Sequence, residues 1–138
     1  MKIVIVDGQG GGIGKGLCEQ MKKRFPQVKV TALGTNSLAT AAMLRAGADV
    51  GATGDNAICV GVRDADIILG PMGLVLADAM LGEISPRVAL AVGRSPAKKI
   101  LIPVARCQML VAGWEEKPLG QLIQDAVDAA GKMIVEES

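Results

Sequence analysis

IVIVDGQGGGIGK, residues 3–15, joins a short apolar run to a cluster of glycines. The run Ile3–Val6 is β-branched throughout and does not alternate with polar residues, which is typical of a parallel-sheet strand covered by helices on both faces. Beyond the glycines, apolar residues recur at helical spacing from Ile13 to Phe25, and Pro26 ends the helix. The segment therefore predicts a strand, a glycine-rich turn and a helix.

Further strands and helices are expected to alternate along the chain. Apolar runs predict strands over residues 28–33, 67–69 and 100–102, and we also expect a short edge strand at 109–111. Capping residues and stop signals predict helices from 36 or 37 to 47, from 74 to 81, from 85 to 92, and after Pro118. Glycines make residues 47–64 ambiguous, although Asp55 can open a short helix there.

This alternation implies right-handed crossovers between parallel strands. The length of 138 residues lies close to the commonest size of one domain. We therefore predict an α/β fold for residues 1–138 as a single domain: a Rossmann-like three-layer sandwich with a mostly parallel sheet of four to five strands.

The composition bears on the partners of the protein. Hydrophobic residues make up 50% of the chain and charged residues 21%, which leaves apolar surface for a small domain to cover. Because symmetric association is the commonest way to cover such surface, we expect a homo-oligomer. Lys and Arg total 15 against 14 Asp and Glu, and Phe25 and Trp114 are the only aromatic residues. Without a basic field or stacking platforms, no nucleic-acid partner is expected.

The chain has no histidine and three widely spaced cysteines. An odd number of cysteines without C-x-x-C spacing is typical of reduced thiols in the cytoplasm. The missing histidine removes the usual general base and the commonest transition-metal ligand, and no metal site is predicted. The first apolar run is too short for a signal peptide, and no run approaches the ~20 residues of a membrane helix. A cytoplasmic protein without membrane contact is therefore expected.

The glycine-rich turn lies where a dinucleotide-binding fold holds its pyrophosphate. Glycines expose backbone amides, and a helix N-terminus adds partial positive charge, so both favour an anion. Five glycines in seven positions fit both G-x-x-x-G-x-G and G-x-G-x-x-x-G spacings. The residues expected to bind a small phosphate-bearing ligand here are Asp7, Gly8, Gln9, Gly10, Gly11, Gly12, Ile13, Gly14 and Lys15. The alternative is a turn that only lets the helix pack closely on the sheet.

Two related chemistries do not fit this turn. In a P-loop, Gln9 should be glycine, and Ser or Thr should stand at Gly16 to bind magnesium, so ATP hydrolysis of that kind is disfavoured. The Tyr-x-x-x-Lys pair of short-chain dehydrogenases is excluded because the chain has no tyrosine. Asp7 would repel a phosphate unless it binds a metal, pairs with Lys15 or meets a ribose or an amide. The alternative is that Asp7 caps the turn.

The residues at the end of the second predicted strand indicate whether the site suits NAD or NADP. NAD sites place an acid about 20 residues beyond the glycines to bind the ribose, but the residues here are Gly34, Thr35, Asn36 and Ser37. The polar side chains of Thr35, Asn36 and Ser37 can donate to the 2'-phosphate of NADP, although no arginine lies beside them. The alternative is an ordinary helix cap.

Other strand ends should meet at the same edge of the sheet. The residues Gly70, Pro71 and Met72 precede a predicted helix, so a second helix N-terminus is expected over the same crevice. Arg106 is expected to clamp a phosphate or carboxylate. Cys107 beside it is either an activated thiolate or, in the simpler interpretation, an inert buried thiol.

Several stretches together resemble a known family. These stretches are residues 7–15, 32–36, 51–58, 81–84 and 102–103, with Arg106 and Cys107. They resemble a family of short bacterial proteins classed as a domain of unknown function and found mainly in anaerobic Firmicutes. The resemblance spans nearly the whole chain and implies a stand-alone Rossmann-like protein, but it brings no activity and no catalytic residues.

Three functional hypotheses follow from the sequence. The leading one is a nucleotide or dinucleotide binder, of NAD(P) type by analogy, that acts as a sensor or accessory protein. The second is a small enzyme that acts on a phosphorylated metabolite at a subunit interface, with Asp7, Lys15, Asp55 and Arg106 in its site. The third is a structural oligomer whose glycine turn binds no ligand.

Overall fold

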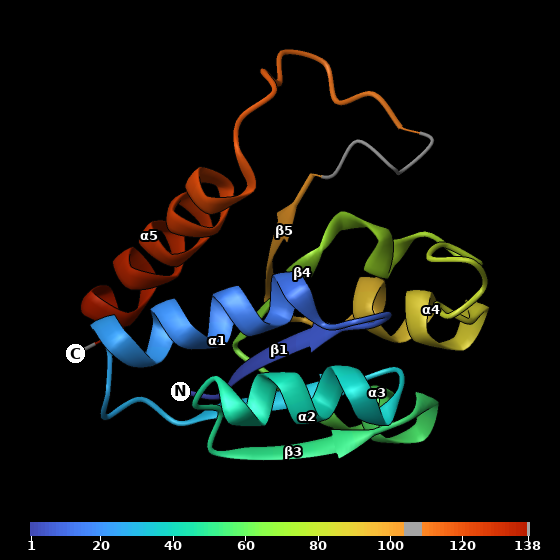
Figure 1. Ribbon diagram of the computed structural model, residues 1–138, viewed down its shortest axis with the longest axis horizontal. Coiled ribbons are helices and arrows are strands. Elements are labelled where there is room, and N and C mark those ends of the chain that lie inside the picture. Colours follow the sequence, from blue (N-terminus) through green and yellow to red (C-terminus); the bar gives the residue numbers. More distant parts are fainter. Residues whose placement is uncertain (104–108, 138) are drawn as a thin grey trace.

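The apolar run near the N-terminus forms β1 (Ile3–Asp7), the central strand of a parallel sheet in the computed structural model. The structure describes residues 1–103 and 109–137, and within them the sheet has five strands in the order β3-β2-β1-β4-β5 (Figure 1). The other strands are β2 (Val30–Gly34), β3 (Val50–Thr53), β4 (Ile67–Pro71) and β5 (Lys98–Ile102). This is the Rossmann strand order, which reverses between β1 and β4. The predicted Rossmann-like α/β fold is confirmed.

Helices cover both faces of this sheet. One face carries α1 (Gly12–Arg24), α2 (Ser37–Arg45) and α5 (Leu119–Glu137). The opposite face carries α3 (Asp55–Gly61), the 3-10 helix η1 (Met72–Val75) and α4 (Pro86–Arg94). The helices predicted to follow the first strand, to begin at 36 or 37, to begin at 85 and to follow Pro118 are all present.

Neighbouring residues of β1 enter two different cores. Ile3 and Ile5 pack with α1, α2 and α5, whereas Val4 and Val6 pack with α3 and α4. All four side chains have no exposed surface. The unbroken β-branched run is thus explained by apolar neighbours on both faces of the strand.

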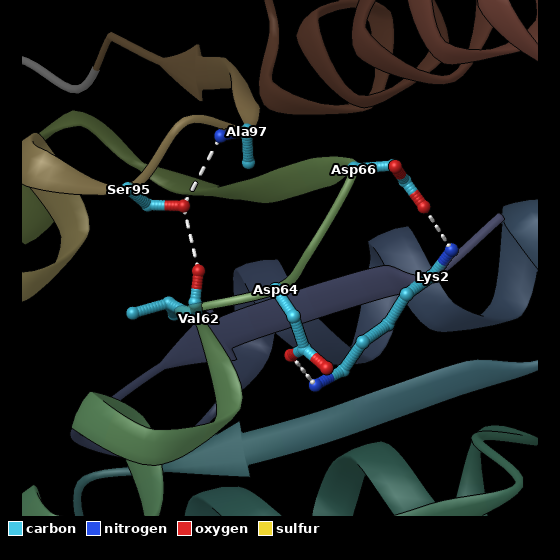
Figure 2. A network of polar contacts seen from close by, with 6 residues as sticks. All are labelled: Lys2, Val62, Asp64, Asp66, Ser95 and Ala97. Atoms are coloured by element: carbon cyan, nitrogen blue, oxygen red, sulfur yellow. Dashed lines mark hydrogen bonds and ion pairs between the residues drawn. The ribbon is translucent and has the colours of Figure 1, made fainter.

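Polar contacts hold the end of the sheet where the strands begin (Figure 2). The backbone amide of Lys2 donates to the carboxylate of Asp66 at 2.5 Å. The side-chain ammonium group of Lys2 forms an ion pair with Asp64. These contacts join the start of β1 to the start of β4. Exposed ion pairs such as Lys2–Asp64 contribute little stability individually.

Ser95 lies at the same end of the sheet and is buried. Its hydroxyl donates to the Val62 carbonyl oxygen at 2.6 Å and accepts from the Ala97 amide at 3.1 Å (Figure 2). One side chain therefore satisfies two backbone groups, one after α3 and one before β5. Buried backbone groups without such a partner carry a large desolvation cost.

The structure differs from the sequence-based expectations in three places. Residues 74–81 form no α-helix: η1 ends at Val75 and turns follow it, with positive φ at Asp78, Met80 and Leu81. Residues 109–111 are not a strand. The ambiguous stretch 47–64 contains β3, an edge strand that was not predicted, whereas α3 is the short helix expected to begin at Asp55.

Replacement of the buried Ser95 hydroxyl should destabilise the fold. In Ser95→Ala the Val62 carbonyl and the Ala97 amide lose their buried partner, so we expect the free energy of unfolding to fall by about 1–3 kcal/mol. Urea denaturation followed by circular dichroism measures the change. Asp64→Asn, which removes only an exposed ion pair, should change stability much less. Equal losses in the two variants would contradict this assignment.

Candidate functional site

The candidate site lies where β1 and β2 end. Three segments meet here: the turn at residues 8–11, the β2 end at residues 34–36, and a loop at residues 76–84, which follows η1. The strand order reverses beside β1, and ligands of open α/β sheets bind at such a point. The fold therefore brings together segments far apart in sequence, at the position expected for a ligand.

The buried side chain of Asp7 forms hydrogen bonds to the backbone at both ends of the glycine-rich turn. Its side chain is buried, and its two carboxylate oxygens accept hydrogen bonds from the amides of Gly8 at 2.7 Å and Gly14 at 2.6 Å. Burial raises the pKa of Asp7, against the lowering effect of the Gly14 and Gly8 amides, and the nearby Glu83 raises it further. The interpretation of Asp7 as a cap of the turn is thus confirmed.

Three of the glycines are required by the structure itself. Gly11 has a φ of 76°, and a Cβ there would lie 2.9 Å from the Cα of Ala39. A Cβ on Gly14 would lie 2.6 Å from Met43 Sδ, and one on Gly8 would lie 2.6 Å from Thr35 Oγ1. A Cβ at these distances would force its neighbours to move, so packing accounts for glycine at these three positions.

The other two glycines of the turn have no such requirement. A Cβ on Gly10 or on Gly12 would meet no atom within 4 Å, and neither residue has a positive φ. Both residues are exposed. Their lack of side chains leaves open space in front of the backbone, at the entrance to α1.

The backbone amides of the turn fall into two groups. Those of Gly8 and Gly14 donate to Asp7, and that of Gln9 donates to Glu83 Oε1 at 2.9 Å. Within residues 1–103 and 109–137, the amides of Gly10, Gly12 and Ile13 have no hydrogen-bond partner. Lys15 lies one turn into α1, is exposed, and makes no ion pair with any described residue.

Glu83 joins all three segments of the site. Its Oε1 accepts from the Gln9 amide, from Thr35 Oγ1 at 2.7 Å and from Asn36 Nδ2 at 2.8 Å. Partial burial by itself raises the pKa of Glu83, but the three hydrogen bonds outweigh burial and hold the pKa below its usual value. The side chain is therefore a carboxylate at neutral pH.

The loop that carries Glu83 has an unusual backbone. Asp78, Met80 and Leu81 have φ values of 68°, 59° and 56°, and each costs on the order of 1–3 kcal/mol for a residue other than glycine. The amide of Asp78 bonds to the Ile84 carbonyl at 2.7 Å and closes the loop. The Met80 side chain lies against Gly8. This loop therefore covers the inner part of the turn.

The side chains of Thr35 and Asn36 at the end of β2 also form hydrogen bonds to other protein groups. Asn36 caps α2 through Oδ1, which accepts from the Ala39 amide, and its Nδ2 donates to the Gln9 carbonyl and to Glu83. Thr35 donates to the same carboxylate, Gly34 is buried, and Ser37 is exposed. The helix-cap interpretation is correct for Asn36.

The remaining predicted residues lie in different surroundings. Gly70 and Pro71 end β4, pair with β5 and are buried, and Met72 begins η1. Because η1 has only four residues, the expected second α-helix N-terminus is absent there. Asp55 accepts from Ser85 Oγ at 2.6 Å. The predictions for Arg106 and Cys107 lie outside the described residues.

Two further groups bear on chemistry. Cys18 is buried in α1, and burial, with smaller effects from Asp7 and Asp49, raises its pKa to about 12. It is an unreactive core thiol, as its position on the apolar helix face predicts. Among the described residues, no cluster of three Cys, Asp or Glu side chains could hold a metal ion.

The fold and this turn define a Rossmann-like α/β protein with a glycine-rich junction between β1 and α1. Residues 2–135 match the family described as Domain of unknown function (DUF3842). The chain belongs to this family, which confirms the resemblance to a domain of unknown function.

Comparison with solved structures finds the dodecameric FMN-dependent UbiX-like decarboxylase from Escherichia coli O157:H7. The match has 19% sequence identity and a TM-score of 0.43, and covers 94% of this chain and 76% of that one. Comparison with curated proteins finds no match. In the part of the chain that the structure describes, each helix is too short or too polar to cross a membrane.

The Glu83 carboxylate should stabilise the fold in a pH-dependent way. A glutamate with a lowered pKa contributes stability above its ordinary pKa of about 4.5 and loses it as the pH falls through the folded value. Glu83→Gln keeps an acceptor oxygen but has no charge, so it should be less stable by about 1 kcal/mol at pH 7.

Urea denaturation of both proteins between pH 7 and pH 3 measures this difference. The difference in free energy of unfolding should stay constant down to about pH 5 and then shrink. Protonation of Glu83 then removes the charge from the unsubstituted protein, whereas Glu83→Gln has no charge to lose. Asp7 is present in both proteins, so the effect of its titration on stability largely cancels in the difference between them. A difference that does not change with pH would contradict the assignment.

Proposed function

We propose that this protein binds a small phosphate-bearing ligand of the nucleotide class at the open face of the junction between β1 and α1. One observation carries the proposal: Gly10 and Gly12 are glycines although nothing in the structure requires it. Packing and backbone geometry account for Gly8, Gly11 and Gly14 but leave these two without a reason. A ligand that approaches the backbone closely supplies that reason.

The donors at this face suit an anion. The free amides of Gly10, Gly12 and Ile13 are available, and the last two belong to the first turn of α1, where the helix dipole is positive. No acidic residue lies in that turn, and Lys15 can add a counter-charge from the helix surface. A phosphate group on this face would accept from the amides without displacing Asp7 or Glu83.

The arrangement favours a compact ligand over NAD or NADP in its usual extended position. In that position the adenosine ribose lies near the end of β2. Here Glu83 is already bonded to Thr35 and Asn36, and Met80 lies against Gly8. A mononucleotide or a sugar phosphate can use the open face without moving these groups.

We infer a binding role, such as that of a sensor or accessory protein. Asp7 and Glu83 are engaged with backbone amides. Asp55, which the enzymatic hypothesis places in the site together with Asp7, bonds to Ser85. Carboxyl groups whose oxygens already accept hydrogen bonds from the protein suit a structural role more than proton transfer to or from a substrate.

A thermal-shift assay tests the proposal. The probes are inorganic phosphate, AMP, FMN, NAD, NADP and glucose 6-phosphate. A ligand at a hundred times its dissociation constant adds about 2.7 kcal/mol of stability, so the melting temperature should rise by several degrees. Gly12→Asp has room for its side chain and suits a helix N-terminus, but its charge should abolish the shift.

Gly120→Asp is the matched control. Gly120 also lies in the first turn of a helix with no atom within 4 Å of its Cβ position, but that helix is α5. This variant should keep the full shift. If millimolar phosphate compounds give no shift, or if both variants lose it equally, the open face of the turn is not the binding site.

We also propose that the protein forms a homo-oligomer. Leu81 and Leu110 are 98% and 99% exposed, and Leu38 is 72% exposed. Large apolar side chains in such positions are often covered by a partner subunit. Light scattering at micromolar concentration should give a mass that is a multiple of the chain mass, and a monomer would refute the proposal.

A further inference from the structure

Trp114 stands apart from the site described above and has an unusual environment. It is the only tryptophan, and the chain has no tyrosine. Its indole Nε1 is buried and has no hydrogen-bond partner among the residues that the structure describes. Buried N–H groups are almost always bonded, because each unbonded one loses its hydration without compensation. The indole N–H is therefore a buried donor that none of the described residues satisfies.

An open cavity of about 230 Å³ lies beside this indole. Its walls are residues 100–103 of β5 and its end, Leu122 and Ala126 of α5, and Trp114 itself. The lining is mainly apolar. At ~30 Å³ for each water molecule of the liquid, the space suits a ligand of about eight non-hydrogen atoms.

This cavity is separate from the glycine-rich turn. Its lining residues come from β5 and its end, from α5 and from the chain that leads into α5. β5 is the edge strand on the far side of β4 from β1 (Figure 1). No residue of the turn or of loop 76–84 lines it. The inference therefore does not depend on the proposed phosphate site.

The charges of the lining residues cancel each other. Lys117 Nζ lies 3.0 Å from Asp125 Oδ2, and Gln121 donates to the other oxygen of Asp125 at 2.8 Å. Among the residues that the structure describes, these two are the only charged ones that line the cavity. A paired lysine and aspartate attract neither an anion nor a cation, so the cavity favours an uncharged ligand.

We propose that the cavity between β5 and α5 binds a small, uncharged, mainly apolar molecule that carries one carbonyl-type acceptor. The apolar part lies against β5, Leu122 and Ala126. The acceptor oxygen bonds to the indole N–H of Trp114. Pockets for small molecules commonly combine an apolar lining with one or two such orienting polar groups.

Nuclear magnetic resonance of the ¹⁵N-labelled full chain tests this proposal, because its one tryptophan gives one indole N–H signal. The probe is cyclohexanone, and the matched control is methylenecyclohexane, in which a CH₂ group replaces the oxygen. Cyclohexanone should move the indole proton signal downfield and saturate. Methylenecyclohexane should bind about fivefold more weakly and cause no downfield shift, because it cannot accept the hydrogen bond.

Two variants connect the effect to the cavity. Trp114→Phe keeps an aromatic ring but loses the N–H donor, so the two probes should bind this variant with equal affinity. Binding to the variant is measured from the backbone amide signals of α5. Ala126→Val narrows the cavity and should weaken both probes. Unchanged signals elsewhere in the spectrum show that each variant is folded.

Three results would overturn the proposal. The first is no saturable indole shift at millimolar cyclohexanone. The second is preferential binding of cyclohexanecarboxylate, which would show that the site takes an anion. The third is an indole signal that moves on dilution of the protein alone, which would show that a second copy of the chain occupies the cavity.

Discussion

The carboxylate of Asp7 fixes the relation between the central strand and the first helix. It ends β1 inside the protein and accepts from the amides on either side of the turn, at Gly8 and Gly14. The close approach of Gly14 to Asp7 and Met43 is possible only without a side chain. Because burial raises the pKa of Asp7, these two hydrogen bonds are what makes a buried carboxyl group tolerable at this point.

The carboxyl group of Asp7 divides the turn into two halves. On the inner half, Asp7 accepts hydrogen bonds from the amides of Gly8 and Gly14, and Glu83 accepts one from the amide of Gln9. On the outer half, Gly10 and Gly12 leave backbone amides uncovered. Within one glycine-rich turn, some glycines are therefore explained by packing, while others leave the backbone exposed.

Glu83 shows why part of the site could not be predicted. The sequence places it 48 residues beyond Thr35, directly after Gly82 and the helix predicted over residues 74–81. Nothing local indicates that its carboxylate meets the β2 end. That contact depends on the parallel sheet, which puts the loops after β1, β2 and β4 at one edge, and on the left-handed backbone at Met80 and Leu81. The same backbone explains why the predicted helix over 74–81 does not form.

The sequence by itself determined the α/β fold, the strand-turn-helix junction and most helix boundaries, because these depend on local periodicity and on caps such as Asn36. Only the tertiary structure decided which glycines are needed for packing, which amides stay free and where Glu83 and Trp114 lie. The physical reason is that steric contact and hydrogen-bond satisfaction are properties of neighbours in space. Those neighbours come from distant segments that the fold alone brings together.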